Sequence, residues 1–238
     1  MTHDTFTGVF PAMTTPFDDD ERIDHETLRE HAQRLETAGV DGLVPVGTTG
    51  ESATMSHDEH VDVIETVVDA VNEVPVIAGS GSNNTREALE LSERAADAGA
   101  DGLLLISPYY NLPEPDGMEA HFRAVADAVD LPQIIYNVPG RTGRNIATET
   151  AASLAAHENI IGYKAASGDV SRINEVIERT QSENFEVLSG DDPITLSIIA
   201  SGGSGCISVA ANVEPERTVA LVGAALSGYF ERARELPH

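Results

Sequence analysis

Apolar, β-rich segments recur along the whole chain, and helix-length amphipathic segments separate them. We expect strands at residues 8–15, 41–47, 75–81, 101–107, 132–138, 159–165, 185–190 and 205–210. Most of these segments are continuous apolar runs, which is typical of parallel strands buried on both faces. Eight strands alternating with helices in 238 residues predict a (β/α)8 TIM barrel, and we expect residues 1–238 to form one domain.

Local signals agree with this alternation. Ser56 and Glu59 form a predicted capping box before a helix whose apolar face begins at Val61. Residues 37–47 (TAGVDGLVPVG) repeat weakly as 97–107 (DAGADGLLLIS), each a helix end, a glycine turn and a strand. An open doubly wound sheet is the alternative, but no strand leads into a G-x-G-x-x-G turn, and the loop 202–205 precedes a strand, which makes it a poor phosphate cradle.

The chain is strongly acidic: it has 40 Asp and Glu residues against 14 Lys and Arg, which gives a formal net charge of −26. Such a chain repels nucleic acid and anionic membranes, so we expect neither as a partner. Lys164 is the only lysine, and every other basic residue that this count includes is arginine. An acidic, lysine-poor surface stays hydrated in concentrated salt, so the composition indicates a halophilic protein.

The remaining composition predicts a soluble protein of the cytoplasm. No apolar run is long enough to span a bilayer, and the N-terminus has no pattern of a secretory signal. Cys206 is the single cysteine, so no internal disulfide can form, and we expect it to be a small core residue and not a nucleophile.

Barrel enzymes carry their sites at the carboxyl ends of the strands. The residues expected there, most of them in polar segments, are Gly47–Glu51, Ser107–Asn111, Tyr136–Gly143, Lys164, Ser189–Asp192 and Ile207. Desolvation inside an apolar barrel lowers the pKa of a lysine, and a neutral amine attacks a carbonyl carbon to form a Schiff base. Tyr136, on the adjacent expected strand, is within reach as a proton carrier. Separately, each residue could be structural: Lys164 could pair with a carboxylate, and Arg141 could be an exposed loop charge.

Six segments make a resemblance specific. They are GTTGESAT (47–54), SPYYN (107–111), YNVPGRTG (136–143), GYKAASGD (162–169), LSGDD (188–192) and CISVAANV (206–213). In this order and spacing the chain resembles the dihydrodipicolinate synthase and N-acetylneuraminate lyase family of class I aldolases, from about residue 7 to about residue 230.

The resemblance implies a catalytic set. Lys164 would form the Schiff base with pyruvate, and Tyr136 would donate and accept protons. Thr48 and Tyr110 would complete a relay with Tyr136, with Tyr110 reaching the site of a neighbouring subunit in a homo-oligomer, a dimer or a tetramer. No cofactor and no metal is implied.

The resemblance also implies substrate contacts and a product. Thr49 and the backbone of Ile207 would hold the pyruvate carboxylate, with Gly190 also in the binding site. Arg141 would receive the carboxylate of aspartate-β-semialdehyde, for which its planar fork is suited. The product would be 4-hydroxy-tetrahydrodipicolinate, which feeds lysine and diaminopimelate synthesis.

A second set is similar to the family's site for feedback by L-lysine. Its members are Ser52, Ala53, His57, His60, Asn83, Glu87 and Tyr109. Glu87 can pair with an ammonium group and Asn83 with a carboxylate. Alternatively, His57 and His60 are ordinary residues of the helix that the capping box begins.

Two other functions remain open at this point. One is a pyruvate-dependent 2-keto-3-deoxy sugar-acid aldolase of the same family, although an extended polyol substrate does not call for Arg141. The other is a non-catalytic, lysine-binding relative. The family also continues into C-terminal helices beyond the barrel, and the chain, which stops at ERARELPH, is expected to lack most of them.

Overall fold

Seven of the eight expected strands form one parallel sheet in the computed structural model, which describes residues 6–236. The strands are β1 (Gly8–Pro11), β2 (Ile77–Gly79), β3 (Gly102–Ile106), β4 (Gln133–Asn137), β5 (Ile160–Ala165), β6 (Glu186–Ser189) and β7 (Gly205–Ser208). Their order is β1-β7-β6-β5-β4-β3-β2, so the first and the last strand of the sequence are neighbours. An α/β barrel brings the two ends of the chain's sheet together in this way.

The segment 41–47 closes the barrel between β1 and β2. It is held by two isolated parallel bridges, Ala12 with Val44 and Leu43 with Val76. The expected strand is therefore in place but shorter than predicted. Pro45 has no N–H to continue the ladder, and Val46 leaves extended geometry at a φ of 49°.

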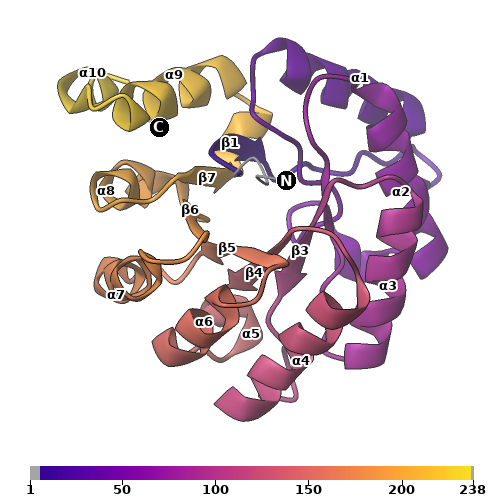
Figure 1. Ribbon diagram of the computed structural model, residues 1–238. Helices are drawn as coiled ribbons and strands as arrows, with labels where there is room; N and C mark the ends of the chain where they lie inside the picture. Colours follow the sequence, from indigo (N-terminus) through magenta and orange to yellow (C-terminus); the bar gives the residue numbers. More distant parts are fainter. Residues whose placement is uncertain (1–5, 237–238) are drawn as a thin grey trace.

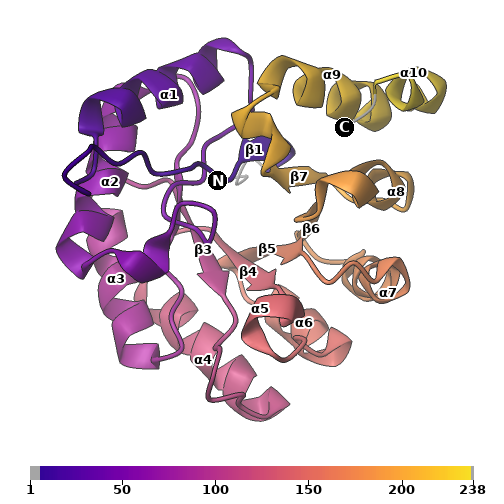
Figure 2. The ribbon, with the colours of Figure 1, turned by 180° about the vertical axis from the view of Figure 1, so that it is seen from behind.

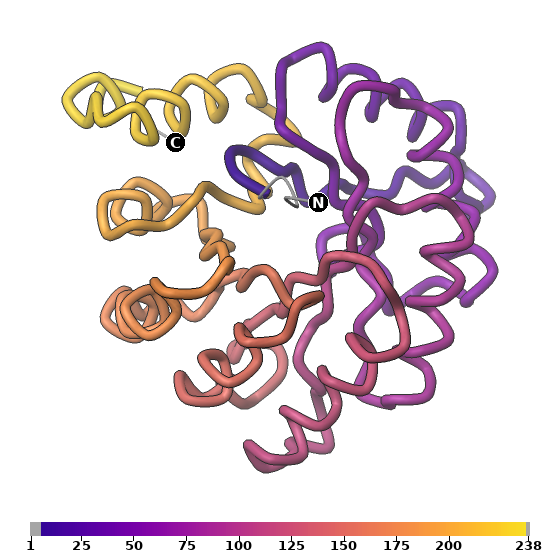
Figure 3. Tube along the Cα trace, viewed as in Figure 1, coloured from indigo at the N-terminus to yellow at the C-terminus, as the bar shows by residue number. Residues whose placement is uncertain are grey.

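Helices surround the strands in a ring (Figure 1). They are α1 (His25–Thr37), α2 (His57–Ala70), α3 (Thr85–Asp97), α4 (Pro115–Ala128), α5 (Pro139–Thr142), α6 (Thr148–Ala155), α7 (Val170–Thr180), α8 (Thr195–Ala200), α9 (Pro215–Leu226) and α10 (Phe230–Arg234). Three single 3-10 turns are η1 (Ser52–Thr54), η2 (Asp192–Ile194) and η3 (Ala210–Asn212). The trace in Figure 3 follows this repeated passage from strand to outer helix, and α9 near the chain's end lies on the same side of the ring as α1. The predicted barrel fold is confirmed.

The helix signals read from the sequence are also confirmed. Ser56 caps α2, its hydroxyl accepts the Glu59 N–H, and the Glu59 carboxylate accepts the Ser56 N–H at 2.8 Å. The internal repeat has one structural role in both copies. The carboxylate of Asp41 accepts the Val9 N–H, and that of Asp101 accepts the Val76 N–H, each joining the start of one strand to its neighbour.

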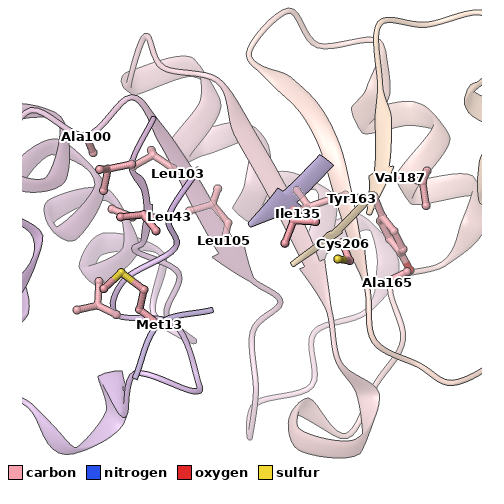
Figure 4. Packing of buried hydrophobic residues seen from close by; sticks show 14 of the residues in the cluster. Met13, Leu43, Ala100, Leu103, Leu105, Ile135, Tyr163, Ala165, Val187 and Cys206 are labelled. Carbon is pink, nitrogen blue, oxygen red and sulfur yellow. The ribbon is translucent and has the colours of Figure 1, made fainter. Parts of the chain in front are cut away.

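The core has two layers. One lies inside the barrel and includes Phe10, Ile77, Leu104, Ile134, Leu188 and Ile207. The other lies between the sheet and the helices, and Figure 4 shows part of it, with Ile135, Tyr163 and Val187 on successive strands. Cys206 belongs to this outer layer and is 1% exposed, so the prediction of a packed core cysteine is confirmed. Burial raises the pKa of its thiol.

Candidate active site

A bulge in β5 points Lys164 into the barrel. Gln133 pairs with Ile160, but Ile134 pairs with Gly162, so Ile161 is an extra residue. Side chains alternate between the two faces of a strand, and one inserted residue reverses the alternation beyond it. Beyond the bulge Tyr163 faces the outer layer, while Lys164 pairs with Tyr136, which belongs to the inner one. The bulge therefore sets which side chain of this strand the barrel interior receives.

Lys164 is buried, with 5% of its surface exposed. Burial lowers its pKa from 10.5 to about 8, and the nearby carboxylates of Asp191 and Asp192 oppose that shift. Gly190 leaves room for the lysine stem, because a Cβ at that position would lie 3.1 Å from Cε of Lys164. A lysine with a pKa near 8 has an appreciable neutral fraction near neutral pH, which is the form that attacks a carbonyl.

Tyr136 lies next to this amine. Nζ of Lys164 is 4.2 Å from the centroid of the Tyr136 ring. Burial raises the pKa of the Tyr136 phenol, and a hydrogen bond with Thr48 and the charge of Arg141 act in the opposite direction. The structure thus brings together three of the predicted residues, Lys164, Tyr136 and Thr48, from two strands and the loop after the barrel-closing segment.

A cavity of about 500 Å³ opens at the carboxyl end of the strands beside this group. Thr48, Tyr136 and Arg141 line one part of it, and Arg141 is carried by the short helix α5, which Figure 2 shows beside β4 and α6. Its walls combine apolar side chains such as Val46, Leu104 and Ile106 with many polar ones, and a cavity of this size is typical of a small-molecule site.

The residues of the predicted lysine site line another part of the same cavity. Those found there are Ser52, Ala53, His57, His60, Glu87 and Tyr109, while Asn83 follows Ser82, which also lines it. Nε2 of His57 lies 3.0 Å from the carboxylate of Glu87. The buried imidazole of His60 donates to the Gly79 carbonyl at 2.7 Å, and burial lowers its pKa.

The remaining predicted residues have different positions. Ile207 is fully buried in the inner layer, on β7. Thr49 is partly buried in the loop of Thr48. Tyr110 is 88% exposed at a φ of 64°, so within one chain it does not meet Tyr136.

Sequence reasoning missed two features of the site. Val46 lines the cavity at a φ of 49°, a backbone conformation that β-branched residues rarely adopt. The sequence predicts Asp191 and Asp192 at this end of the barrel but gives them no role, and in the structure they lie close enough to affect the pKa of Lys164. A glycine-aspartate pair at the end of a barrel strand was the available signal.

An α/β barrel in which one desolvated lysine meets a buried tyrosine defines an enzyme of the class I aldolase type. Within residues 6–236 no helix is long and apolar enough to cross a membrane. The chain belongs to the dihydrodipicolinate synthetase family, whose family model matches residues 5–238.

Individual relatives agree with this placement. The chain is 86% identical to a 4-hydroxy-tetrahydrodipicolinate synthase from Natronomonas pharaonis, over all of this chain and 81% of the relative. A dihydrodipicolinate synthase from Acinetobacter baumannii, solved with pyruvate, superposes with a TM-score of 0.95 at 40% identity and covers 98% of this chain and 80% of its own. The dihydrodipicolinate synthase from Cyanidioschyzon merolae, solved with lysine bound, superposes with a TM-score of 0.93 at 38% identity. The match covers 97% of this chain and 79% of the synthase chain.

Proposed function

We propose that Lys164 is the nucleophile of a synthase reaction and that Tyr136 moves its protons. The activity is that of a 4-hydroxy-tetrahydrodipicolinate synthase, a lyase of lysine and diaminopimelate biosynthesis that condenses pyruvate with aspartate-β-semialdehyde. The observation that carries the residue assignment is the 4.2 Å approach of the only lysine to the ring of Tyr136.

The chemistry follows from a neutral amine in a dry site. Nζ attacks the keto carbon of pyruvate, and the carbinolamine loses water to give an iminium ion. The iminium withdraws electrons, so the methyl carbon releases a proton and an enamine forms. The enamine carbon then attacks the aldehyde carbon of the second substrate and makes the new carbon–carbon bond. Tyr136, hydrogen-bonded to Thr48, is placed to carry protons in these steps.

Arg141 is proposed to bind the carboxylate of aspartate-β-semialdehyde. It lines the cavity on the same side as Tyr136 and is exposed, so its guanidinium fork is available for a bidentate contact. Thr49, Gly190 and the Ile207 backbone are proposed to surround pyruvate, because Gly190 lies against the lysine stem and Ile207 faces the barrel interior.

A homo-oligomer would give Tyr110 its role. The side chain is almost fully exposed at the tip of the loop after β3, and a large exposed aromatic is a typical interface residue. We propose that it reaches the Thr48–Tyr136 pair of a second copy. Each chain is proposed to form one barrel domain with one such site, and to act in the cytoplasm.

The second part of the cavity is proposed to bind L-lysine. Glu87 holds His57 at 3.0 Å, and the ammonium group of a lysine ligand would replace that imidazole. Calorimetry with L-lysine tests this, with Glu87→Gln as the variant expected to lose the heat of binding. Binding that survives in this variant would contradict the proposed contact.

The test of the function is turnover in high salt with both substrates. We expect consumption of aspartate-β-semialdehyde with pyruvate, and an increase in the aldehyde KM of roughly 10- to 100-fold in Arg141→Ala, the loss expected for one charge-assisted pair. Arg144→Ala is the matched control, since Arg144 lies just after α5 but donates to the Pro113 carbonyl. Turnover of 2-keto-3-deoxy sugar acids alone would assign the chain to the sugar-acid aldolases, and lysine binding without turnover would make it a sensor.

A further inference from the structure

Asp192 accepts hydrogen bonds from three donors at the end of β7 and in the two residues that follow it. Its Oδ1 accepts the Ser208 hydroxyl at 2.5 Å, and its Oδ2 accepts the N–H groups of Val209 and Ala210 at 3.1 and 3.0 Å. The Ser208 oxygen in turn accepts the N–H of Ala211 at 3.0 Å. A single carboxylate therefore fixes three consecutive residues, and these begin directly after Ile207.

The neighbouring carboxylate has a different partner. Oδ2 of Asp191 accepts the N–H of Gly168 at 3.1 Å, in the loop after β5. Asp191 and Asp192 thus tie the loop after β6 to the loops on either side of it. Lys164 lies on β5, and both carboxylates are near enough to act on its charge. The two residues resemble each other in charge but hold different segments.

We propose that Asp192 is a positioning residue for pyruvate: by holding Ser208, Val209 and Ala210, it fixes the peptide groups of β7 that receive the substrate carboxylate. This inference rests on the proposed function, in which the Ile207 backbone contacts pyruvate. The three hydrogen bonds join Asp192 to the end of β7 and to the two residues after it. A shift of this segment relative to the barrel would break hydrogen bonds on both oxygens of the carboxylate.

The physical reason is that a misplaced peptide group of β7 would bind the pyruvate carboxylate less tightly. Ile207 is fully buried and pairs with Phe10 of β1, so its position along the sheet is set. On one side Ser208 still pairs with Pro11 of β1, and its carbonyl accepts the Ala12 N–H at 2.8 Å. On the other side the ladder with β6 has already stopped at Cys206, so the sheet holds this strand end from one side only. Hydrogen bonds to a charged acceptor are the stronger kind, and Asp192 supplies them at that point.

A purely structural turn would have the same hydrogen bonds, so the test must separate substrate binding from folding. Asp192→Asn and Asp191→Asn each remove one negative charge near Lys164, and only the first disturbs the loop after β7. Asparagine keeps only one acceptor oxygen, so either the Ser208 hydroxyl or the two backbone N–H groups lose their acceptor. The readout is the pyruvate concentration that half-saturates borohydride trapping at Lys164, which needs no second substrate.

We expect Asp192→Asn to raise that concentration about tenfold, the loss typical of one charge-assisted hydrogen bond, with trapping at saturating pyruvate nearly unchanged. Asp191→Asn should leave the half-saturating concentration within about twofold, and both variants should shift the pH profile of trapping in the same direction, since both remove a charge that raises the pKa of Lys164. Ser208→Ala, which removes one of the three donors, should give an intermediate increase.

Equal half-saturation in the wild type, Asp192→Asn and Ser208→Ala would overturn the proposal, as would an equal increase in Asp191→Asn. If Asp192→Asn does not fold in high salt, Ser208→Ala decides by the same criterion, because it leaves the carboxylate and both backbone donors in place. A wild-type chain that traps no pyruvate would instead refute the proposed function, so the two failures are distinguishable.

Discussion

The two ends of the barrel differ in how they accommodate unusual backbone geometry. At the amino end of the strands, positive φ angles fall on glycine, at Gly8, Gly39, Gly99, Gly202 and Gly205. At the carboxyl end, loops carry positive φ on Gly143 and Gly168 and also on residues other than glycine. Those among the described residues are Glu21, Val46, Glu51, Tyr110 and Leu112.

The difference shows where strain is tolerated. Asp41 and Asp101 join neighbouring strands at the amino end by accepting hydrogen bonds from backbone N–H groups. Val46 and Tyr110 lie beside or at the mouth that holds the cavity, in conformations that cost free energy. Strained residues persist where the surrounding structure holds them, commonly at functional sites. The amino end therefore serves stability and the carboxyl end serves chemistry.

We expect the largest effect of a single substitution on stability at the amino end of the strands. A Cβ at Gly205 would lie 2.0 Å from the Gly8 carbonyl oxygen, at a φ of 145°. Gly205→Ala should lower the free energy of unfolding by about 4 kcal/mol, from overpacking and backbone strain together, as measured by denaturant unfolding in high salt. Gly223→Ala is the control, because its Cβ meets nothing within 4 Å in α9, and it should gain about 0.5–1 kcal/mol. A Gly205→Ala protein as stable as the wild type would contradict the claim that the amino end of the strands serves stability.

A substitution at the carboxyl end should do the reverse and affect activity more than stability. Tyr136→Phe removes the hydroxyl from the ring that Nζ of Lys164 lies against, and kcat should fall about 100-fold or more, as for other lost proton carriers. The free energy of unfolding should change by only about 1 kcal/mol, the loss of the bond with Thr48. Tyr163→Phe is the matched control, since Tyr163 faces the outer layer. Equal activity losses in the two variants would contradict the assignment.

The pH dependence of trapping sharpens the same contrast. Because the pKa of Lys164 is about 8, the neutral fraction and the trapping rate at low pyruvate should rise about tenfold per pH unit below pH 8 and level off above it. The stability contribution of this group has a definite sign. Between pH 8 and 10.5 the unfolded lysine binds more protons than the native one, so that contribution rises with pH in this window. A rate that keeps rising to pH 10 would place the amine in an ordinary aqueous environment.

The smallest expected change in stability comes from relieving backbone strain at one exposed residue. Glu51 has a φ of 60° and lies in the loop of Thr48. Glu51→Gly should stabilise the fold by about 0.5 kcal/mol, the relief of left-handed geometry less the entropy that glycine loses on folding. Denaturant unfolding of the variant and the wild type in high salt measures this change in the free energy of unfolding. Destabilisation would mean that the Glu51 side chain, and not the backbone, matters there.

The fold was largely predictable because it rests on periodic signals. Eight apolar segments gave the strands, and the capping box at Ser56 and the repeated Asp41 and Asp101 turns lie where their patterns placed them. The second strand was overestimated because Pro45 and Val46 stop its ladder. These two residues look like ordinary members of an apolar run.

The site was predictable only as a set of residues. Motif positions brought Lys164, Tyr136, Thr48 and Arg141 to one mouth. The bulge at Ile161, which turns Lys164 inward, depends on the register with β4, and a single sequence does not reveal register. The contacts of Asp192 with the loop after β7 span 16 to 18 residues, and no local pattern announces them.

The central claim is that one desolvated amine forms an imine with a keto acid. The most direct measurement is peptide mass spectrometry after borohydride reduction in the presence of pyruvate. Because Lys164 is the only lysine, the α-amino terminus is the one competing amine. We predict that the peptide containing Lys164 gains the mass of pyruvic acid less one oxygen atom and that Lys164→Met gains nothing. An unmodified Lys164 peptide from enzyme that still makes product would contradict the account.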